Sequence, residues 1–275
     1  MSLFCDTALA GRIERAEAQL MAAASEAARR RAPGGPGFVI PVAGGVASFA
    51  EDGSPFNKVA GLGFGGVPGP GELEEIERAF AACGAPVQVE LADLADPAIG
   101  ALLTGRGYRL VSFENVLGLA LADLPGQARP AGVEIRRGGG LRAWLEAVTE
   151  ASIHPDTEGV PSHEEFSRGL IENAERDLVA AGATPYLALR DGVVAGGASA
   201  RLADGGVAQF TGAATLPAHR RRGVQTALLA ARAADAAAAG CDIAVVTTQP
   251  GSRSQHNVQR RGFDLLYTRA ILVKE

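Results

Sequence analysis

The spacing of hydrophobic and polar positions changes repeatedly along the chain, and each change marks the end of one predicted element. In the second half, alternating or continuous apolar runs predict strands, whereas apolar positions at helical spacing predict helices. The predicted order is strand 132–137, helix 141–152, helix 162–181, strands 186–190, 193–202 and 207–216, helix 224–239, strand 242–248, helix 254–261 and strand 263–274.

Turn and cap residues support these boundaries. Asp191-Gly192 and Asp204-Gly205-Gly206 are hairpin turn signals between the three central strands. Gly240 is placed to end the alanine-rich helix that starts at Val224. Ser162 with Glu165 three residues later has the spacing of a capping box, which predicts that a helix starts there.

The first half shows a similar order with shorter elements. It predicts helix 12–31, strands 38–43, 46–50 and 58–64, helix 72–82, strand 87–91, helix 99–104 and strand 109–121. Arg106-Gly107-Tyr108 and Arg261-Gly262-Phe263 each lie between a short helix and a long strand, at a spacing of about 155 residues. Convergent use of a glycine cap is the alternative, but the shared order and spacing favour duplication.

A Pro/Gly-rich stretch, 124–132, separates the two halves and is typical of a linker or exposed crossover. We therefore expect a structural half over residues 1–126 and a second domain over residues 132–275. The fold class is α/β in the α+β sense. Each half should form a mixed, mostly antiparallel sheet flanked by helices.

Composition narrows the class of protein. Of the 275 residues, 47% are hydrophobic and 21% are charged, which is typical of a globular chain. The net charge of −5 argues against a dedicated nucleic-acid binder. The three cysteines lack metal-ligand spacing, so we expect reduced thiols and no metal site. The N-terminal residues contain no long apolar run, so neither a signal peptide nor a membrane span is expected, and the predicted location is cytoplasmic.

The stretch from Thr215 to Leu229 carries the most specific chemistry. It joins a predicted strand to a predicted helix and reads Thr-Leu-Pro-Ala-His-Arg-Arg-Arg-Gly-Val-Gln-Thr-Ala-Leu-Leu. A helix start has unpaired N–H groups and the positive end of the helix dipole, so it attracts phosphate. Gly223 lets the backbone approach a pyrophosphate, and the arginines before it add charge and bidentate donors. No Gly-Lys-Ser/Thr follows, which excludes a Walker loop.

This stretch resembles the Arg/Gln-x-x-Gly-x-Gly/Ala signature of the GNAT superfamily of N-acetyltransferases, which grips the pyrophosphate of acetyl-CoA. The order of elements over 132–275 is similar to that fold, and the first half resembles a degenerate second copy, as in tandem GNAT proteins. The resemblance implies acetyl-CoA, or another acyl-CoA, as co-substrate. The residues it implies for cofactor binding are Thr215, Leu216, Pro217, Arg220, Arg221, Arg222, Gly223, Val224, Gln225, Thr226, Ala227 and Asn257.

Three positions depart from the family pattern. Gln225 stands where the signature has Gly or Ala. Val258 lies four residues before Gly262, where many members have the tyrosine that protonates the departing thiolate. Gln209 lies in the strand that often supplies a glutamate base, and an amide cannot take a proton.

Other residues are candidates for the acid–base steps. Ser252, Ser254 and Tyr267 could supply the missing proton, although the two serines are at least as well suited to cap a helix and Tyr267 to fill a strand. The loop residues His154, Asp156, Glu158 and His163 could serve as base or attract a cationic amine, with a solvated loop as the alternative. Gly212 in mid-strand suits a bulge or a close approach to the thioester, with a small residue in a core of small residues as the alternative.

The first half has no counterpart to the phosphate-binding stretch. Its corresponding segment, 65–70, contains no arginine, and Glu72, Glu74 and Glu75 follow at the start of the predicted helix. These carboxylates would occupy the favourable end of the helix dipole and repel a pyrophosphate. We therefore expect this half to be structural and to shape the acceptor groove.

The leading functional hypothesis is transfer of an acetyl or small acyl group from CoA to a primary amine by direct attack in a ternary complex. The acceptor would be a small molecule or a peptide, with no nucleic acid or membrane partner, and the protein a monomer or homodimer. A CoA-binding regulatory or scaffold module without catalysis is the main alternative, suggested by Gln209 and Val258. Use of aminoacyl-tRNA as donor is disfavoured by the acidic charge and the intact phosphate-binding stretch.

Overall fold

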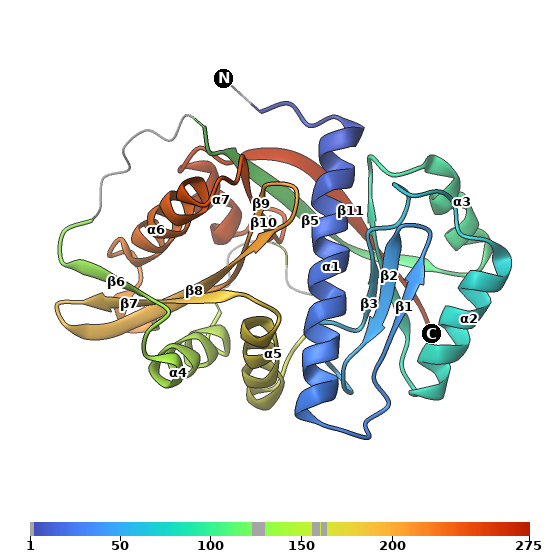
Figure 1. Cartoon of the computed structure of the whole chain (residues 1–275), viewed down its shortest axis with the longest axis horizontal. Helices are drawn as coiled ribbons and strands as arrows, with labels where there is room; N and C mark the ends of the chain where they lie inside the picture. Colours follow the sequence, from blue (N-terminus) through green and yellow to red (C-terminus); the bar gives the residue numbers. More distant parts are fainter. Residues whose placement is uncertain (1–2, 123–129, 156–159, 161–163) are drawn as a thin grey trace. The chain divides into compact units, whose positions relative to one another are not determined.

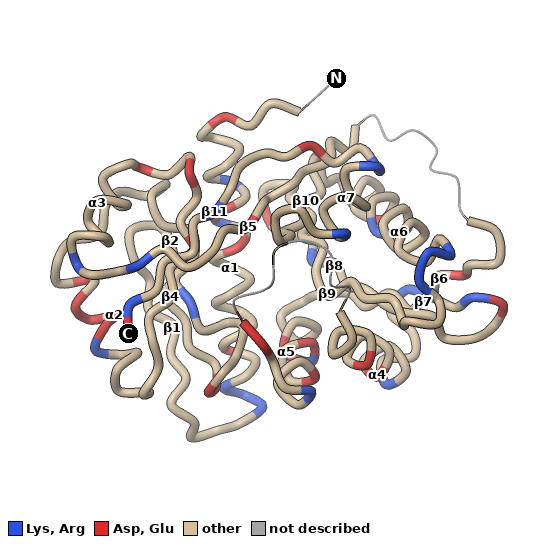
Figure 2. The backbone as a smooth tube through the Cα atoms, turned by 180° about the vertical axis from the view of Figure 1, so that it is seen from behind, with Lys and Arg blue, Asp and Glu red and all other residues tan. Residues whose placement is uncertain are grey.

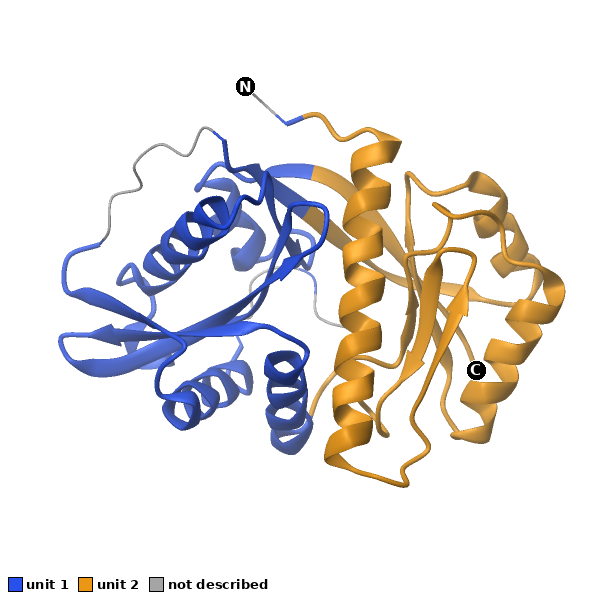
Figure 3. Ribbon diagram, in the orientation of Figure 1, with its two compact units in different colours: residues 1–3, 117–161, 167–265 blue, residues 4–116, 162–166, 266–275 orange. Residues whose placement is uncertain are grey.

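The computed structural model describes residues 3–122, 130–155, 160 and 164–275. The chain divides into two compact units (Figure 3). The C-terminal unit contains mainly residues 117–161 and 167–265, and the N-terminal unit contains mainly residues 4–116 and 266–275. The predicted boundary between residues 126 and 132 falls largely outside the described residues and stays a prediction. No described helix is long and apolar enough to span a membrane.

The C-terminal unit contains part of an 11-stranded sheet, with helices on both faces (Figure 1). Its elements are β6 (Val133–Arg137), α4 (Leu141–Ser152), α5 (Arg168–Ala180), β7 (Thr184–Arg190), β8 (Val193–Ala203), β9 (Val207–Thr215), the short 3-10 helix η1 (Pro217–His219), α6 (Val224–Ala238), β10 (Ile243–Thr248) and α7 (Arg253–Gln259). Strands β6 to β9 are antiparallel to their neighbours, and β9 pairs with β10 in parallel.

Alternation along β8 places α4 and α6 on opposite faces of this sheet. A Cβ at Gly197 would touch Trp144 and Val148 of α4. The next residue, Ala198, belongs instead to the apolar cluster that contains Leu228 of α6. Trp144 is fully buried and donates from Nε1 to the carbonyl of Ala198 at 2.9 Å, so it belongs to the core.

The N-terminal unit also has a sheet covered on both faces. Its elements are α1 (Thr7–Arg31), β1 (Phe38–Val42), β2 (Gly45–Phe49), β3 (Lys58–Ala60), α2 (Pro70–Ala82), β4 (Val87–Ala92) and α3 (Pro97–Gly105). Helix α1 lies against β1, β2 and β3, whereas α2 and α3 contribute Ile76, Phe80 and Leu103 to the main apolar cluster. Two antiparallel pairings are followed by a parallel one, between β3 and β4, whereas the C-terminal unit has three antiparallel pairings before its parallel one.

The closing strand of each half completes the sheet of the other half. Strand β5 (Arg109–Ala120) ends the first half, and it lies beside β10 in the strand order. Strand β11 (Asp264–Lys274) ends the second half, but its residues 269–274 pair with β4 over 87–92. Each strand therefore contributes residues to both units.

The repeat predicted from the sequence is confirmed in detail at its clearest point. Gly107 and Gly262 end α3 and α7 with φ of +90° and +89°. The following aromatic residues, Tyr108 and Phe263, are both 3% exposed. Their amides bond back to the carbonyls of Leu103 and Val258. The α/β class, mostly antiparallel and flanked by helices, is likewise as predicted, but the strands of the two halves belong to one 11-stranded sheet instead of two separate ones.

Some predicted boundaries were wrong. Helix α5 begins at Arg168, because Ser167 is its N-cap and accepts a bond from the amide of Leu170. Glu165 therefore precedes the helix, and the proposed cap Ser162 lies outside the described residues. Helix α1 begins five residues earlier than predicted, since Asp6 caps it by accepting from Leu9 N at 2.8 Å.

Candidate functional site

Strands β9 and β10 separate partway along their length. Their parallel pairing covers only 207–209 of β9 and 243–245 of β10, although β9 continues to Thr215 and β10 to Thr248. Just beyond the last pair, Gly212 has φ +53°. Two residues of β9, Gly212 and Ala213, lie opposite the single residue Ala198 of β8. This is a β-bulge, as the sequence predicted, and it re-aims the end of β9.

The segment between β9 and α6 has an unusual backbone. Arg221 has φ +61° and Gly223 has φ +82°, so two left-handed residues lie just before the helix. A Cβ on Gly223 would come within 2.7 Å of Pro130. Glycine is therefore required at position 223 both for its conformation and for space.

The start of α6 is left open. Its N-cap is Gly223, and no side chain caps the helix. The amides of the first turn consequently have no acceptor within the helix, which is the arrangement that binds phosphate at helix starts. The left-handed residues before it add the alternating backbone conformation typical of anion-binding nests.

A cavity of about 570 Å³ opens directly at this helix start. Its walls come from the end of α4, the end of β9, the segment before α6, the first turns of α6, and α7. Five arginines line it, namely Arg220, Arg221, Arg253, Arg260 and Arg261, together with His219. Aspartate and glutamate are absent from the lining in the described part of the chain. The cavity is therefore strongly cationic and suits a polyanion.

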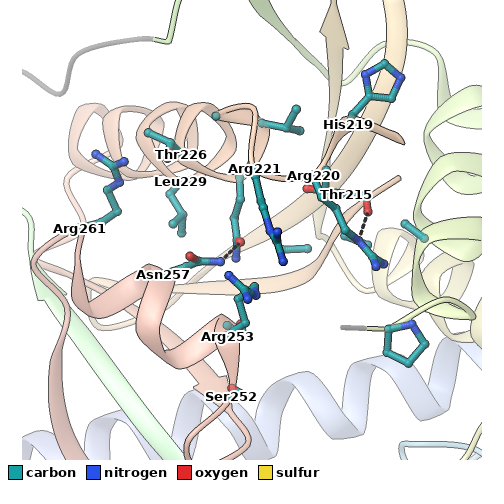
Figure 4. A pocket seen from close by; sticks show the side chains of 18 of the residues that line it. Thr215, His219, Arg220, Arg221, Thr226, Leu229, Ser252, Arg253, Asn257 and Arg261 are labelled. Atoms are coloured by element: carbon teal, nitrogen blue, oxygen red, sulfur yellow. Dashed lines mark hydrogen bonds between the residues drawn. The ribbon is translucent and has the colours of Figure 1, made fainter. Parts of the chain in front are cut away.

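Two of these arginines approach each other from different elements (Figure 4). Arg221 projects from the segment before α6, and Arg253 projects from α7 into the same space. Arg220 donates from Nε to the carbonyl of Thr215 at 3.3 Å and from its terminal nitrogen to the carbonyl of His154. The buried Nδ1 of His219 has no hydrogen-bond partner among the described residues. These groups fit a phosphate-bearing ligand, because all the cationic side chains are donors.

Most of the residues predicted to bind cofactor lie together in this cavity. The lining includes Thr215, Arg220, Arg221, Gly223, Val224, Gln225, Thr226 and Asn257. Four others, Leu216, Pro217, Arg222 and Ala227, are not part of it. Arg222 is exposed, and its carbonyl accepts from Arg190. Ala227 is buried against the sheet because it faces inward from the first turn of α6.

Helix α7 supplies the opposite wall. Ser252 caps it by accepting from the amide of Gln255, as one of the two sequence interpretations held. Ser254 is exposed and lines the cavity. The amide of Asn257 donates to Gln225 at 2.7 Å, so α6 and α7 are joined across the cavity. Val258 is 1% exposed and belongs to the apolar core, where it offers no proton.

Tyr267 is not among the residues that line the cavity. It is 3% exposed, belongs to the N-terminal unit, and donates from its hydroxyl to Glu14 at 2.6 Å. The guanidinium of Arg269 donates to the same carboxylate at 2.8 Å. Burial, and then the negative charge of Glu14, raise the pKa of Tyr267 well above its ordinary value, although Arg269 opposes this shift. The structure therefore gives no support to Tyr267 as the proton donor in the cavity.

The remaining acid–base candidates do not meet at one point. Gln209 is buried and accepts from Arg201 at 2.9 Å, so its amide holds a cross-strand contact. His154 bonds to the carbonyl of Glu150 and its own carbonyl accepts from Arg220. Asp156, Glu158 and His163 lie outside the described residues.

Two buried ionisable residues near the bulge were missed by the sequence prediction. Glu175 of α5 is 7% exposed and Arg232 of α6 is 1% exposed. Arg232 donates to the carbonyls of Leu228 and Ser199, and it lies over the ring of Phe210 at 4.5 Å. Both residues have buried apolar neighbours on their helix: Leu178 lies three positions after Glu175, and Leu228, Leu229 and Ala236 lie three or four positions from Arg232. A charge on an apolar stripe is the signal that could have revealed them.

Comparison with known proteins agrees with this geometry. Residues 145–263 match the family model described as acetyltransferase (GNAT) family. No curated protein sequence matches the chain. Among solved structures, a GCN5-related N-acetyltransferase from Kribbella flavida is 24% identical with a TM-score of 0.70, covering 97% of this chain and 95% of that one.

Two further structures extend the likeness. A tandem GNAT protein from the clavulanic acid biosynthesis pathway is 14% identical with a TM-score of 0.61, covering 92% of this chain and 87% of that one. A GCN5-related N-acetyltransferase from Sphaerobacter thermophilus is 21% identical with a TM-score of 0.54, covering 74% and 66%. The fold is thus that of tandem GNAT proteins. The second half of the chain, over residues 145–263, is a domain of the GNAT acetyltransferase family.

Proposed function

We propose that the protein is an acyl-CoA-dependent N-acyltransferase that moves an acetyl or small acyl group to a primary amine. The observation that carries this proposal is the cationic cavity built on the open start of α6, at the point where β9 has left β10. The cavity has both a phosphate-binding end and an open strand edge.

The cationic end suits the phosphates of CoA. The first-turn amides of α6, with Arg220 and Arg221 beside them, would hold the pyrophosphate. Arg260 and Arg261 at the far end of α7 supply further charge for the 3′-phosphate. Acidic and basic residues are otherwise interspersed along the chain (Figure 2), so this concentration of arginines is local.

The open edge of β9 suits the pantetheine arm and the thioester. Backbone groups of β9 beyond residue 209 lack β10 as a partner, so an extended, amide-containing arm can bond along this edge. When bound, the acyl-CoA supplies the acyl group as a thioester. Ala213 of the bulge and Ala214 after it line the cavity and leave space beside that group. Positioning an amine here would provide much of the rate enhancement.

The rival proposal, a CoA-binding module without turnover, rests on Gln209 and Val258, neither of which can carry a proton. Both proposals predict CoA binding, and they differ in whether the thioester is consumed. Release of free CoA from acetyl-CoA in the presence of a panel of primary amines separates them. Transfer to at least one amine is expected, and binding without any transfer would favour the module.

Cofactor binding itself is tested by thermal denaturation. Acetyl-CoA should raise the Tm, because a ligand that binds only the native state stabilises it. The double variant Arg220→Ala/Arg221→Ala should lose most of this rise while the free protein keeps its Tm. Arg222→Ala is the matched control, since Arg222 lies in the same run but outside the cavity lining. An equal loss in the control, or none in the double variant, would refute the assignment.

A further inference from the structure

Glu175 is a buried carboxylate with no evident structural role. It lies on α5, and its side chain is on the apolar stripe that includes Ala174 and Leu178. Its oxygen Oε2 is buried and has no hydrogen-bond partner among the described residues. An unpartnered buried carboxylate costs stability, and a leucine or methionine on this stripe would not.

The carboxylate lies against the bulge of β9. A Cβ built on Gly212 would be 2.6 Å from both oxygens of Glu175, so only glycine leaves room for them. The next residues along the chain, Ala213 and Ala214, line the cavity. Glu175 is therefore at the point where β9 departs from β10, which is the point where the thioester would lie.

The surroundings keep this carboxylate poised between its two forms. Burial raises the pKa of Glu175 from 4.5 to about 7, and burial is the only cause of the shift. Charged groups on the elements packed around it have partners of their own. Glu172 pairs with Arg176, Glu150 pairs with Arg168, and Arg201 donates to Gln209. A base whose pKa lies near the working pH is the most effective kind.

We propose that Glu175 is the general base of the acyl transfer, a role that rests on the proposed function of the cavity. The carboxylate removes a proton from the ammonium group of the acceptor. The freed nitrogen lone pair then attacks the thioester carbonyl carbon, so that an N–C bond forms and the C–S bond breaks. A proton lost from nitrogen ends on the thiolate of CoA, and the proton on Glu175 passes to solvent.

This assignment accounts for one departure from the family pattern, the glutamine at position 209. Strand β9 has Gln209 where many members of the family have a glutamate base, so the strand itself provides no carboxylate there. Helix α5 provides one instead, from the face of the sheet opposite α6. It also accounts for the conformation of Gly212, because the bulge makes room for the carboxylate beside the strand edge. A carboxylate on a helix is held more rigidly than one on a loop, which suits a base that must meet a bound amine.

The test compares Glu175→Gln with Glu172→Gln, a control three residues earlier on the same helix. Glu175→Gln should lower kcat at least 100-fold, at the lower end of general base catalysis, and leave the acetyl-CoA-induced rise in Tm unchanged. Wild-type kcat/KM should show a limb near pH 7 that disappears in Glu175→Gln. The ionisation of the acceptor is common to both proteins, so the ratio of their rates isolates this limb.

Stability provides an independent measurement. The folded pKa of Glu175 is above its unfolded value, so the carboxyl stabilises the fold at low pH, and this stability is lost as pH rises through the range between 4.5 and about 7. Glu175→Gln should therefore have the higher Tm at pH 8, although it is the less active protein. A structural role would lower both Tm and kcat.

The possible outcomes separate the two proposals. An active wild type whose Glu175→Gln variant keeps its kcat and its pH limb would overturn the base and leave the acyltransferase intact. A wild type that binds acetyl-CoA but transfers nothing to any amine would overturn the acyltransferase and the base with it. Loss of activity in Glu172→Gln equal to that in Glu175→Gln would also overturn the base, since the effect would belong to the helix.

Discussion

The starts of α2 and α6 occupy the same place in the two repeats but have opposite chemistry. Each helix connects two strands that pair in parallel, β3 with β4 and β9 with β10. At α2 the carboxylate of Glu72 accepts a hydrogen bond from the backbone amide of Gly69 at 2.7 Å, and Pro70 occupies the first helical position. At α6 no side chain caps the helix, and arginines lie beside it.

This difference shows how one fold can serve two purposes. A helix start must satisfy its orphan N–H groups, either with a side chain of the protein or with a ligand. The first half uses its own carboxylate and so has no place for an anion. The second half leaves the place open, which makes it a binding site and requires the cationic wall around it.

The strongest expected effect concerns the second half alone. A fragment of residues 132–275 keeps the open helix start but loses β4, the partner of residues 269–274 of β11, and β5, which lies beside β10. Two unpaired apolar strands favour aggregation. The fragment should be insoluble or unfolded by circular dichroism. A soluble fragment that binds acetyl-CoA would show that the first half is dispensable.

The bulge should be sensitive to a single methyl group. Gly212→Ala places a β carbon at φ +53° and against the oxygens of Glu175, and it should cost about 2 kcal/mol of unfolding free energy. Gly182→Ala is the control, because its φ is +98° and a Cβ there meets nothing within 4 Å. Urea denaturation should show a larger loss for Gly212→Ala, and acyl transfer should fail only in that variant.

The cap of α2 should affect stability without affecting ligand binding. Glu72→Ala removes the acceptor of the Gly69 amide, and it should cost about 1 kcal/mol. Glu75→Ala, an exposed position on the same helix, is the control and should cost less. Neither variant should change the affinity for acetyl-CoA in a titration. Weaker binding in Glu72→Ala would contradict the assignment of α2 as purely structural.

The smallest effect is expected at Ser254, which lines the cavity from α7. A CoA thiolate is a good leaving group, so Ser254→Ala should lower kcat by about tenfold or less, at the weak end of acid catalysis. Tyr267→Phe is a useful comparison because its hydroxyl is bonded to Glu14 in the N-terminal unit. It should lower the Tm and leave kcat unchanged. A large loss of kcat in Tyr267→Phe would return that residue to the mechanism.

The sequence predicted those parts of the fold and site that depend on local chemistry. The glycine caps at Gly107 and Gly262, the bulge at Gly212 and the left-handed Gly223 are all short-range features, because glycine is the residue that such conformations favour. The order of helices and strands was predicted from the same kind of local signal, the turn and cap residues between them. The arginines before α6 are also a local feature, because they lie next to Gly223 in the sequence.

Long-range features could not be read in this way. Strand β11 has the same alternation whichever strand it pairs with, so its pairing with β4 leaves no local trace. The places of Glu175 and Tyr267 depend on which elements pack together, and only the apolar stripe around Glu175 gave a hint. Helix α5 begins later than predicted because its N-cap is Ser167. A serine at 167 and one at 162 give the same local capping signal, so the sequence does not distinguish them.

The central claim, that only the open helix start binds the cofactor, is tested most directly by the stoichiometry of binding. Calorimetric titration of the full chain with acetyl-CoA should give a single site per chain, and Arg220→Ala/Arg221→Ala should abolish the heat of binding. A stoichiometry near two, or binding that survives in the double variant, would show that α2 or another part of the molecule holds the cofactor.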